Sequence, residues 1–318
     1  MSPETTRFTL AVMYDASEEE PPSSLKTIQK LIEIGKRRRV TITCGNFQRL
    51  QELNFDALFI RQTTLPGNDA HKLACLAELH KIPVIDDPAS IEASCDKLEM
   101  AVRFASAGLP TPLSRSLRIK GLDKETFRIV KQQIAPFGYP IVIKDPASSF
   151  SRGVFKAENE HELHTILTRL KFTCSHVQAQ EFVPTRFDWR IGVLNNRAIY
   201  CCQYNMVPGH WQVIKNNLDG TYTDGSYVTL RPGLWPQDIC SLAVRAASCV
   251  GTGLYGVDIK ETKHGPLVIE VNDNPSIDIG EEDKYGNVWE PILEHFRRLV
   301  SKGERLHYVQ DPRGVPAV

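Results

Sequence analysis

The segment that most constrains the fold is residues 256–275, which read GVDIKETKHGPLVIEVNDNP. Apolar and polar residues alternate on both sides of a turn at residues 262–266, and this alternation predicts the two strands of a β-hairpin. Successive side chains of a strand point to opposite faces, so Glu270 and Asn272 share a face onto which the pairing can bring Asp258. Two carboxylates and an amide oxygen form a hard-oxygen site of the kind that suits Mg²⁺.

The alternative for this segment is a surface hairpin whose outward face is merely polar. The run Asn272-Asp273-Asn274-Pro275 favours the metal site, because so many polar residues directly after an apolar strand are costly. Gly253 and Gly256, which open the first strand, favour it as well.

Composition bounds the class of protein. A chain of 318 residues is long enough for two or three packed units, and its 42% hydrophobic and 24% charged residues are typical of a globular protein. Lysine plus arginine equals aspartate plus glutamate at 38 each, so no overall positive field attracts nucleic acid, and we expect no nucleic-acid partner. The basic run at residues 36–39 closes a helix pattern, where cations suit the helix dipole.

Cysteine usage and hydropathy indicate where the protein works. The eight cysteines form no CxxC pair, which favours buried free thiols in a reducing compartment. No apolar run approaches the length of a membrane span, and the acidic residues that follow residues 8–14 are unlike a signal peptide. We therefore expect a cytoplasmic protein that does not associate with a membrane.

The first part of the chain has the pattern of a small α/β domain. Short apolar runs at residues 8–14, 40–43, 57–60 and 84–85 are typical of buried parallel strands, and helix patterns lie between them. This pattern ends near Pro88. The run Arg61-Gln62-Thr63-Thr64 follows a strand, where open α/β sheets place ligand contacts, and a plain polar loop is the equal alternative.

The middle of the chain contains a candidate phosphate site. Helices are predicted at residues 97–107 and 124–135, and the strand at 141–143 ends in Lys144, where an ammonium could lie over phosphate. The loop Ser148-Ser149-Phe150-Ser151-Arg152-Gly153-Val154 comes four residues later. Backbone N–H groups in such a loop can form an anion-binding concavity, although one glycine in a serine-rich loop more often marks a simple hairpin.

The remaining patterns alternate between strands and helices. Helices are predicted at residues 160–170, 235–250 and 288–300, and strands at 177–184, 188–194 and 198–203. Arg190 shares a strand face with Asp188 and is a candidate site residue. The alternative is that Arg190 is a solvated charge at the edge of the sheet. Residues 204–231 have no clean period, and a loop this long is either functional or disordered. The acids at 278–283 complement the dipole of the last helix.

With these parts in order, residues 8–300 resemble the RimK-like branch of the ATP-grasp superfamily. The resemblance rests on the D…ExN…P pattern of the hairpin and on four further segments. These are residues 148–154, Gln180-Glu181, residues 187–192 and Gly209-His210-Trp211. It implies an α/β protein whose ATP-grasp part is α+β and follows a small parallel-sheet α/β domain. The expected ranges are 1–88 for the N-terminal domain, 89–184 for the central subdomain with its phosphate loop, and 185–318 for the C-terminal subdomain.

The resemblance also implies a role for each candidate site residue. Lys97 and Lys144 would contact the nucleotide phosphates, and the loop with Ser149, Ser151, Arg152 and Gly153 would cover them. Gln180, Glu181 and Val183 would read the adenine edge, with Asp188 toward the ribose. Arg190 would stabilise the transferred phosphoryl group, with Lys215 as a helper. Asp258, Glu270 and Asn272 would bind Mg²⁺, with Mn²⁺ as an alternative.

The implied reaction is carboxylate–amine ligation. ATP would phosphorylate a small-molecule or peptide carboxylate, and an amine, expected to be an amino acid, would displace phosphate from the acyl phosphate and leave an amide. No Ser-His-Asp or Cys-His nucleophile is convincing, and this reaction requires none. Alternatives are a small-molecule kinase of the same fold and a nucleotide-binding sensor without turnover, and the chain could form a homo-oligomer. The loop around Lys215 departs from the arginine-rich run of the glutamate ligase RimK, which leaves the acceptor open.

Overall fold

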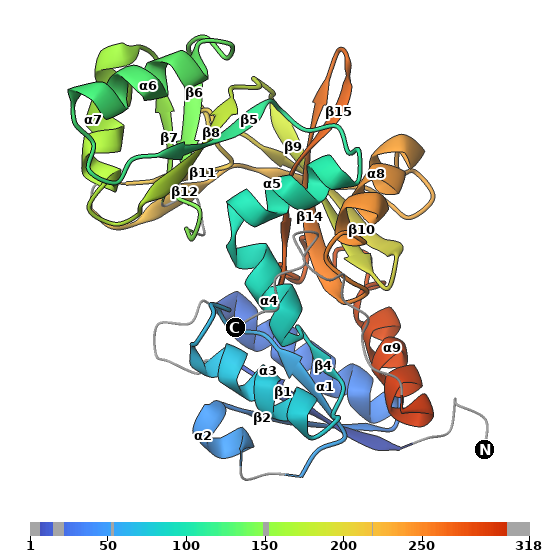
Figure 1. The fold of residues 1–318 in the computed structure, drawn as a ribbon. Helices are drawn as coiled ribbons and strands as arrows, with labels where there is room; N and C mark the ends of the chain where they lie inside the picture. Colours follow the sequence, from blue (N-terminus) through green and yellow to red (C-terminus); the bar gives the residue numbers. More distant parts are fainter. Residues whose placement is uncertain (1–6, 15–21, 52–53, 149–152, 218, 304–318) are drawn as a thin grey trace.

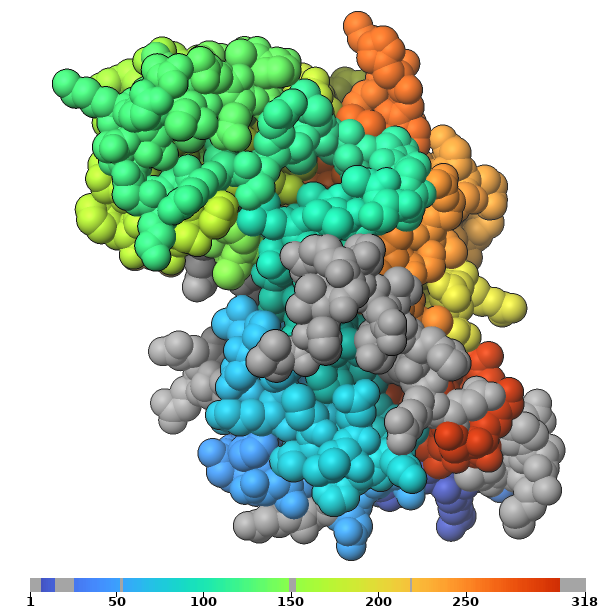
Figure 2. Space-filling view, in the orientation of Figure 1, coloured from blue at the N-terminus to red at the C-terminus, as the bar shows by residue number. Residues whose placement is uncertain are grey.

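The computed structural model describes residues 7–14, 22–51, 54–148, 153–217 and 219–303. Three sheets and their helices make up three masses that are visible both as ribbon (Figure 1) and as surface (Figure 2). The blue N-terminal mass lies below, the green central mass at the upper left, and the orange C-terminal mass at the upper right.

The N-terminal sheet is parallel, with the strand order β2-β1-β3-β4. Its strands are β1 (Phe8–Met13), β2 (Val40–Gly45), β3 (Ala57–Ile60) and β4 (Val84–Ile85). The helices of this part are α1 (Pro22–Arg37), α2 (Phe47–Leu50) and α3 (Asp69–Leu79). The apolar runs that were predicted to be strands form this sheet. Their continuous apolar character fits a parallel sheet that is covered on both faces.

Strand β1 illustrates how the two faces are used. Leu10 and Val12 pack with α1, whereas Ala11 and Met13 point to the opposite face and pack with α2 and α3. This is the period of two expected for a strand buried on both sides.

The last helix, α9 (Trp289–Lys302), returns to the N-terminal sheet. The ring of Phe59 in β3 makes edge contacts with Trp289 and Phe296, at centroid distances of 6.5 and 5.5 Å. Figure 1 shows α9 in red beside the blue strands. Helix α9 therefore shares a core with the N-terminal sheet, although it lies within the predicted range 185–318.

Two helices lead from the N-terminal sheet to the rest of the molecule: α4 (Pro88–Cys95) and α5 (Lys97–Ser106). Each begins at an aspartate that caps it, because the side chains of Asp87 and Asp96 accept hydrogen bonds from backbone N–H groups of the first turn. Met100 and Phe104 of α5 pack against the C-terminal sheet, so α5 does not belong to the core of the central mass.

The central sheet is antiparallel, with the strand order β5-β8-β6-β7. Its strands are β5 (Ser114–Arg118), β6 (Ile141–Lys144), β7 (Val154–Ala157) and β8 (His176–Glu181). Helices α6 (Lys124–Ile134) and α7 (Glu160–Leu170) cover one face and bury Val130, Leu163 and Leu167 against Ile141 and Ile143.

The C-terminal sheet has the order β13-β10-β9-β14-β15 and is antiparallel throughout. Its strands are β9 (Phe187–Leu194), β10 (Arg197–Asn205), β13 (Tyr227–Thr229), β14 (Leu254–Thr262) and β15 (Gly265–Asn272). Helix α8 (Gln237–Ala247) packs on one face. The region expected to be an irregular loop contains a small hairpin, β11 (Ile214–Asn216) and β12 (Tyr222–Asp224). Within the described ranges, no helix combines the length and apolar character that crossing a bilayer requires.

Candidate functional site

A cavity of about 610 Å³ lies where the three masses meet. All three contribute to its wall: Thr63 and Thr64 from the loop after β3, Lys144 and Gln180 from the central sheet, and the polar face of the β14–β15 hairpin. Of the residues predicted for the site, the cavity is lined by Lys97, Lys144, Gln180, Arg190, Asp258, Glu270 and Asn272. The sequence pattern thus identified residues that the fold brings together from six different elements.

The β14–β15 hairpin is confirmed, with its three oxygen-bearing side chains on one face. Asp258 lies directly opposite Glu270 in the register, and Gly256 lies opposite Asn272. The Nδ2 atom of Asn272 donates to Asp258 Oδ2 and to Glu270 Oε1, both at 3.3 Å. The two carboxylates therefore lie on either side of one amide group.

Burial and neighbouring charges act on this pair of carboxylates. Burial raises the pKa of Asp258 to about 7 against the effect of Arg190, and the charge of Glu270 adds to the increase. Burial also acts to raise the pKa of Glu270, but the surrounding positive charges, led by Lys97 and Lys144, outweigh it and lower that pKa. Two close carboxylates in a buried place favour a cation beside them, so this donor set fits a hard divalent metal ion.

Arg190 reaches the same face from the neighbouring strand. It lies opposite Asp258 in the β9–β14 register, and its Nε and Nη2 atoms donate to the two carboxylate oxygens, the second at 3.0 Å. Its guanidinium carbon lies 5.2 Å from the ring centroid of Tyr204. Its neighbours in the strand, Trp189 and Ile191, are buried on the opposite face. The strand alternation predicted for Arg190 is therefore confirmed, and its side chain lines the cavity.

Two lysines contribute positive charge on the side of the central sheet. Lys144 ends β6 and is only 6% exposed, and burial lowers its pKa to about 8. Lys97 begins α5, and its Nζ donates to the backbone oxygen of Ser148. Both ammonium groups thus lie near the start of the predicted phosphate loop. An ammonium in such a place is costly to bury unless an anion accompanies it.

The phosphate loop is described only at its ends, because Ser149, Ser151 and Arg152 lie outside the described residues. Ser148 and Val154 line the cavity. The N–H of Asp145 donates to the oxygen of Gly153 at 2.8 Å, which holds the two ends of the loop together. A Cβ atom on Gly153 would collide with the side chain of Ser148, so this closure requires glycine.

The other predicted contacts have different positions. Gln180 is buried and donates to Ser114 Oγ at 3.1 Å. Four other predicted residues are not among the described residues that line the cavity: Glu181, Val183, Asp188 and Lys215. Asp188 lies 2.6 Å from Lys260 Nζ, to which it is paired. Lys215 is exposed on β11, while its neighbours Ile214 and Asn216 line the cavity, as the alternation of a strand requires.

Several lining residues were not expected from the sequence. Asp278, Glu281 and Glu282 offer oxygen atoms that all lie within 4.8 Å of one another, whereas the sequence assigned these acids only to the dipole of the last helix. Glu282 already accepts hydrogen bonds from the hydroxyl of Tyr204 and from the N–H of Asp278. No local pattern distinguishes such residues from a solvated acidic loop, because their position depends on the whole chain.

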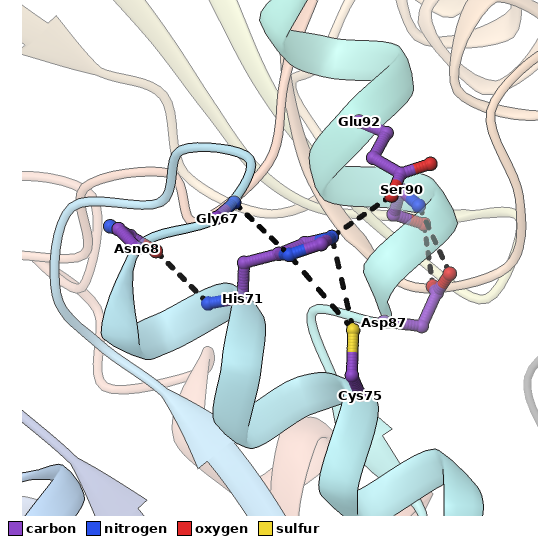
Figure 3. Close-up of polar contacts among 7 residues, drawn as sticks. All are labelled: Gly67, Asn68, His71, Cys75, Asp87, Ser90 and Glu92. Atoms are coloured by element: carbon purple, nitrogen blue, oxygen red, sulfur yellow. Dashed lines mark hydrogen bonds and ion pairs between the residues drawn. The ribbon is translucent and has the colours of Figure 1, made fainter. Parts of the chain in front are cut away.

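A second cluster of polar residues lies apart from the cavity, on α3 and α4 (Figure 3). His71 Nε2 lies 3.0 Å from Glu92 Oε1, and the N–H of Gly67 donates to His71 Nδ1 at 3.2 Å. Cys75 Sγ is 3.9 and 4.0 Å from the two ring nitrogens, near the upper limit for a hydrogen bond to sulfur. Burial, Glu92 and Glu78 raise the pKa of the Cys75 thiol. Because the ring nitrogens of His71 are bound by Gly67 and Glu92 and the pKa of the thiol is raised, this arrangement does not form an activated nucleophile.

Comparisons with known proteins show which family the chain resembles. The family model described as the RimK-like ATP-grasp domain matches residues 95–295. A protein of Hahella chejuensis named "Probable alpha-L-glutamate ligase 2" is 28% identical over 261 residues, which are 80% of this chain and 79% of the relative.

Solved structures share the fold. A RimK domain ATP-grasp protein from Sphaerobacter thermophilus superposes with a TM-score of 0.65 at 20% identity, over 92% of this chain and 99% of the other. D-Alanine–D-alanine ligase from Bacillus anthracis, complexed with ATP, superposes with a TM-score of 0.67 at 16% identity, over 94% of this chain and all of the other (100%).

The chain therefore belongs to the RimK-like ATP-grasp family, because the family model matches more than half of it. The predicted fold class is confirmed. The protein is an ATP-dependent carboxylate–amine ligase.

Proposed function

We propose that this ligase joins a carboxylate to the amine of an amino acid through an acyl phosphate, and that it releases ADP and phosphate. The observation that carries the proposal is the row Arg190–Asp258–Glu270. These residues lie side by side on β9, β14 and β15, and their side chains face one cavity that also contains Lys97 and Lys144. Metal ligands and fixed positive charges thus converge on one place, which phosphoryl transfer requires.

Asp258, Glu270 and Asn272 would hold the metal, which we propose to be Mg²⁺, with Mn²⁺ able to replace it. Their oxygen donors fit a hard cation that keeps its other positions for water and phosphate. When bound, the metal would neutralise charge on the β- and γ-phosphates of ATP. The amide of Asn272 between the two carboxylates keeps both donors turned toward the same point.

The chain's own cations would then position and stabilise the moving phosphoryl group. Lys144 and Lys97 would bind the phosphates, and burial of Lys144 makes an anionic partner favourable. Arg190 would stabilise the charge that develops on the phosphoryl oxygens. The substrate carboxylate attacks the γ-phosphorus, the bond to the bridging oxygen of ADP breaks, and the amine then attacks the acyl carbon. The amine loses a proton and phosphate departs with one former carboxylate oxygen.

The remaining roles rest on the family pattern. Gln180, Glu181 and Val183 would contact adenine, and Asp188 the ribose. The family pattern also gives Lys215 a helper role at the phosphoryl group, but we do not adopt it because Lys215 does not line the cavity. The predicted loop residues Ser149, Ser151, Arg152 and Gly153 would cover the phosphates, and the ranges 1–88, 89–184 and 185–318 remain our proposed division into domains. A cytoplasmic location is part of the proposal and is supported by eight free cysteines.

The test is the set of products formed with a panel of amino acids and short peptides. Purified protein with ATP and Mg²⁺ should release ADP and phosphate only when a suitable carboxylate and amine are both present. Mass spectrometry should detect an amide whose mass is lower than the sum of the two substrates by that of one water, which the condensation removes overall. A stable phosphorylated small molecule without an amide would indicate a kinase, and AMP with pyrophosphate would indicate adenylation.

A further inference from the structure

The short segment that leaves β15, Asn274 and Pro275, is hydrogen-bonded by residues that follow the strands of the N-terminal sheet. Arg61 donates from Nη1 to Asn274 Oδ1 at 2.6 Å and from Nη2 to the oxygen of Pro275 at 2.9 Å. Asn274 in turn donates from Nδ2 to the oxygen of Gln62 at 2.5 Å and from its N–H to Asp86 Oδ2 at 2.8 Å. Both side-chain polar atoms of Asn274 and its backbone N–H are therefore bound by residues of the N-terminal mass.

The residues that hold this segment come from the ends of two parallel strands. Arg61 directly follows β3, and its N–H donates to the oxygen of Met13 in β1 at 2.7 Å. The guanidinium carbon lies 5.4 Å from the ring centroid of Phe59. Asp86 directly follows β4 and is 1% exposed. Arg61 and Asp86 are therefore anchored on rigid strands. Rigid supporting elements are required to hold a neighbouring site in a fixed geometry.

The held segment begins directly after the proposed metal ligands. Asn274 has a φ of 41°, in the left-handed region that asparagine tolerates better than most residues, so the chain turns sharply two residues after Asn272. The turn directs Pro275 onto Gly256 of β14, where an added Cβ would lie 2.8 Å from Pro275 Cβ and 3.3 Å from Arg190 Cδ. Gly256 is the residue that pairs with Asn272.

We propose that Arg61 is a positioning residue for the metal site. It fixes the exit of β15 through Asn274 and Pro275, and thereby fixes the orientation of Asn272 and Glu270 toward the metal. The N-terminal domain is then a working part of the catalytic centre and not only a neighbour of it. This inference rests on the metal assignment of the proposed function.

The alternative is that Arg61 only connects the N-terminal mass to the segment after β15 and has no effect on the metal ligands. The chain offers a matched example of such a contact: Arg38, which follows α1, pairs with Glu290 of α9 at 2.6 Å on the surface. That pair also joins the N-terminal mass to the C-terminal part of the chain, but it makes no hydrogen bond to the segment after β15. Arg38→Ala is therefore the control for Arg61→Ala.

A positioning role and a purely connecting role for Arg61 predict different affinities of the Arg61→Ala variant for a metal ion. Free Mn²⁺ would be measured by electron paramagnetic resonance while the protein is titrated in the presence of a non-hydrolysable ATP analogue, so that no turnover is needed. Residues that orient metal ligands typically change metal affinity by about tenfold to a hundredfold when they are removed. Arg61→Ala should weaken Mn²⁺ binding by about tenfold or more, whereas Arg38→Ala should bind Mn²⁺ as the wild type does.

A second variant separates positioning from a general loss of structure. Asn274→Gly retains the left-handed turn and the backbone bond to Asp86 but removes the two side-chain hydrogen bonds. It should weaken Mn²⁺ binding as Arg61→Ala does, and the double variant should lose little more, since both changes break one connection. If Arg61→Ala does not fold by circular dichroism, Asn274→Gly alone decides the question.

Three results would overturn the inference. Folded Arg61→Ala or Asn274→Gly protein with wild-type Mn²⁺ affinity would remove the positioning role and leave the proposed function intact. Failure of both variants to fold would make the contact purely structural. Wild-type protein that binds no Mn²⁺ with the nucleotide analogue would overturn the metal assignment itself, and with it this inference.

Discussion

Arg190 and Asp258 face each other across the pairing of β9 and β14, and the guanidinium donates to both oxygens of the carboxylate. Glu270 lies opposite Asp258 on the other side, so one row of charges crosses three strands in register. The same carboxylate is thus the partner of Arg190 and a proposed metal ligand. A cation beside Asp258 would compete with Arg190 for these oxygens and leave the guanidinium available to a phosphoryl group.

The first prediction concerns Arg190. Arg190→Ala should lower kcat by on the order of a hundredfold or more, because a donor aimed at developing charge stabilises the transition state more than the bound substrate. The dissociation constant for ATP should change far less. Steady-state kinetics and nucleotide titration measure the two quantities. Arg197→Ala, at an exposed position of the adjoining strand, is the control and should retain both values.

Glu270 provides a second test. Glu270→Ala should reduce ATP turnover by on the order of a hundredfold or more, since a bound metal contributes several kcal/mol to this chemistry. The protein should remain folded because the side chain is not part of a hydrophobic core. Turnover and circular dichroism check the two statements, with the surface variant Glu125→Ala as reference. A folded Glu270→Ala enzyme with near-normal Mg²⁺-dependent turnover would show that the metal site lies elsewhere.

Lys144 should matter for nucleotide binding. Lys144→Met removes a buried charge that we assign to the phosphates, and a charged hydrogen bond of about 1.5–3 kcal/mol corresponds to roughly a 10- to 100-fold loss of ATP affinity. Calorimetric titration with a non-hydrolysable analogue measures it. Lys120→Met, exposed after β5 in the same part of the molecule, should bind as the wild type. Equal affinity in both variants would remove Lys144 from the phosphate site.

Much of the fold follows from local sequence patterns. Helix α7 is observed at the predicted residues 160–170, and β4 at residues 84–85. The β14–β15 hairpin was predicted together with the face that carries Asp258, because strand alternation and a turn specify both. These features depend on residues that are close together in the sequence, so local sequence patterns are enough to predict them.

Other features depend on contacts between distant residues. The packing of α9 against Phe59 and the bonds between Arg61 and Asn274 join positions more than 200 residues apart, and no local pattern predicts them. The hairpin β11–β12 was missed because its strands have three residues each, too few for a period to be recognised.

Lys215 is the residue on which the sequence pattern and the observed geometry differ most. The family pattern gives it a helper role, but its strand neighbours Ile214 and Asn216 line the cavity and its own side chain is exposed. A side chain that does not face the cavity should be dispensable, so Lys215→Ala should retain kcat within about twofold, the range expected for a surface substitution of less than 0.5 kcal/mol. A large loss of kcat without a change in melting temperature would instead support the helper role.

The reaction route is tested most directly by the fate of the carboxylate oxygens. With the substrate carboxylate labelled in both oxygens with ¹⁸O, an acyl phosphate must transfer one labelled oxygen to the released phosphate, because that oxygen bridges carbon and phosphorus before the amine attacks. We predict one ¹⁸O in each inorganic phosphate, with ADP as the nucleotide product and slower label transfer in Arg190→Ala. Unlabelled phosphate formed together with the amide, or label recovered in AMP, would contradict the account.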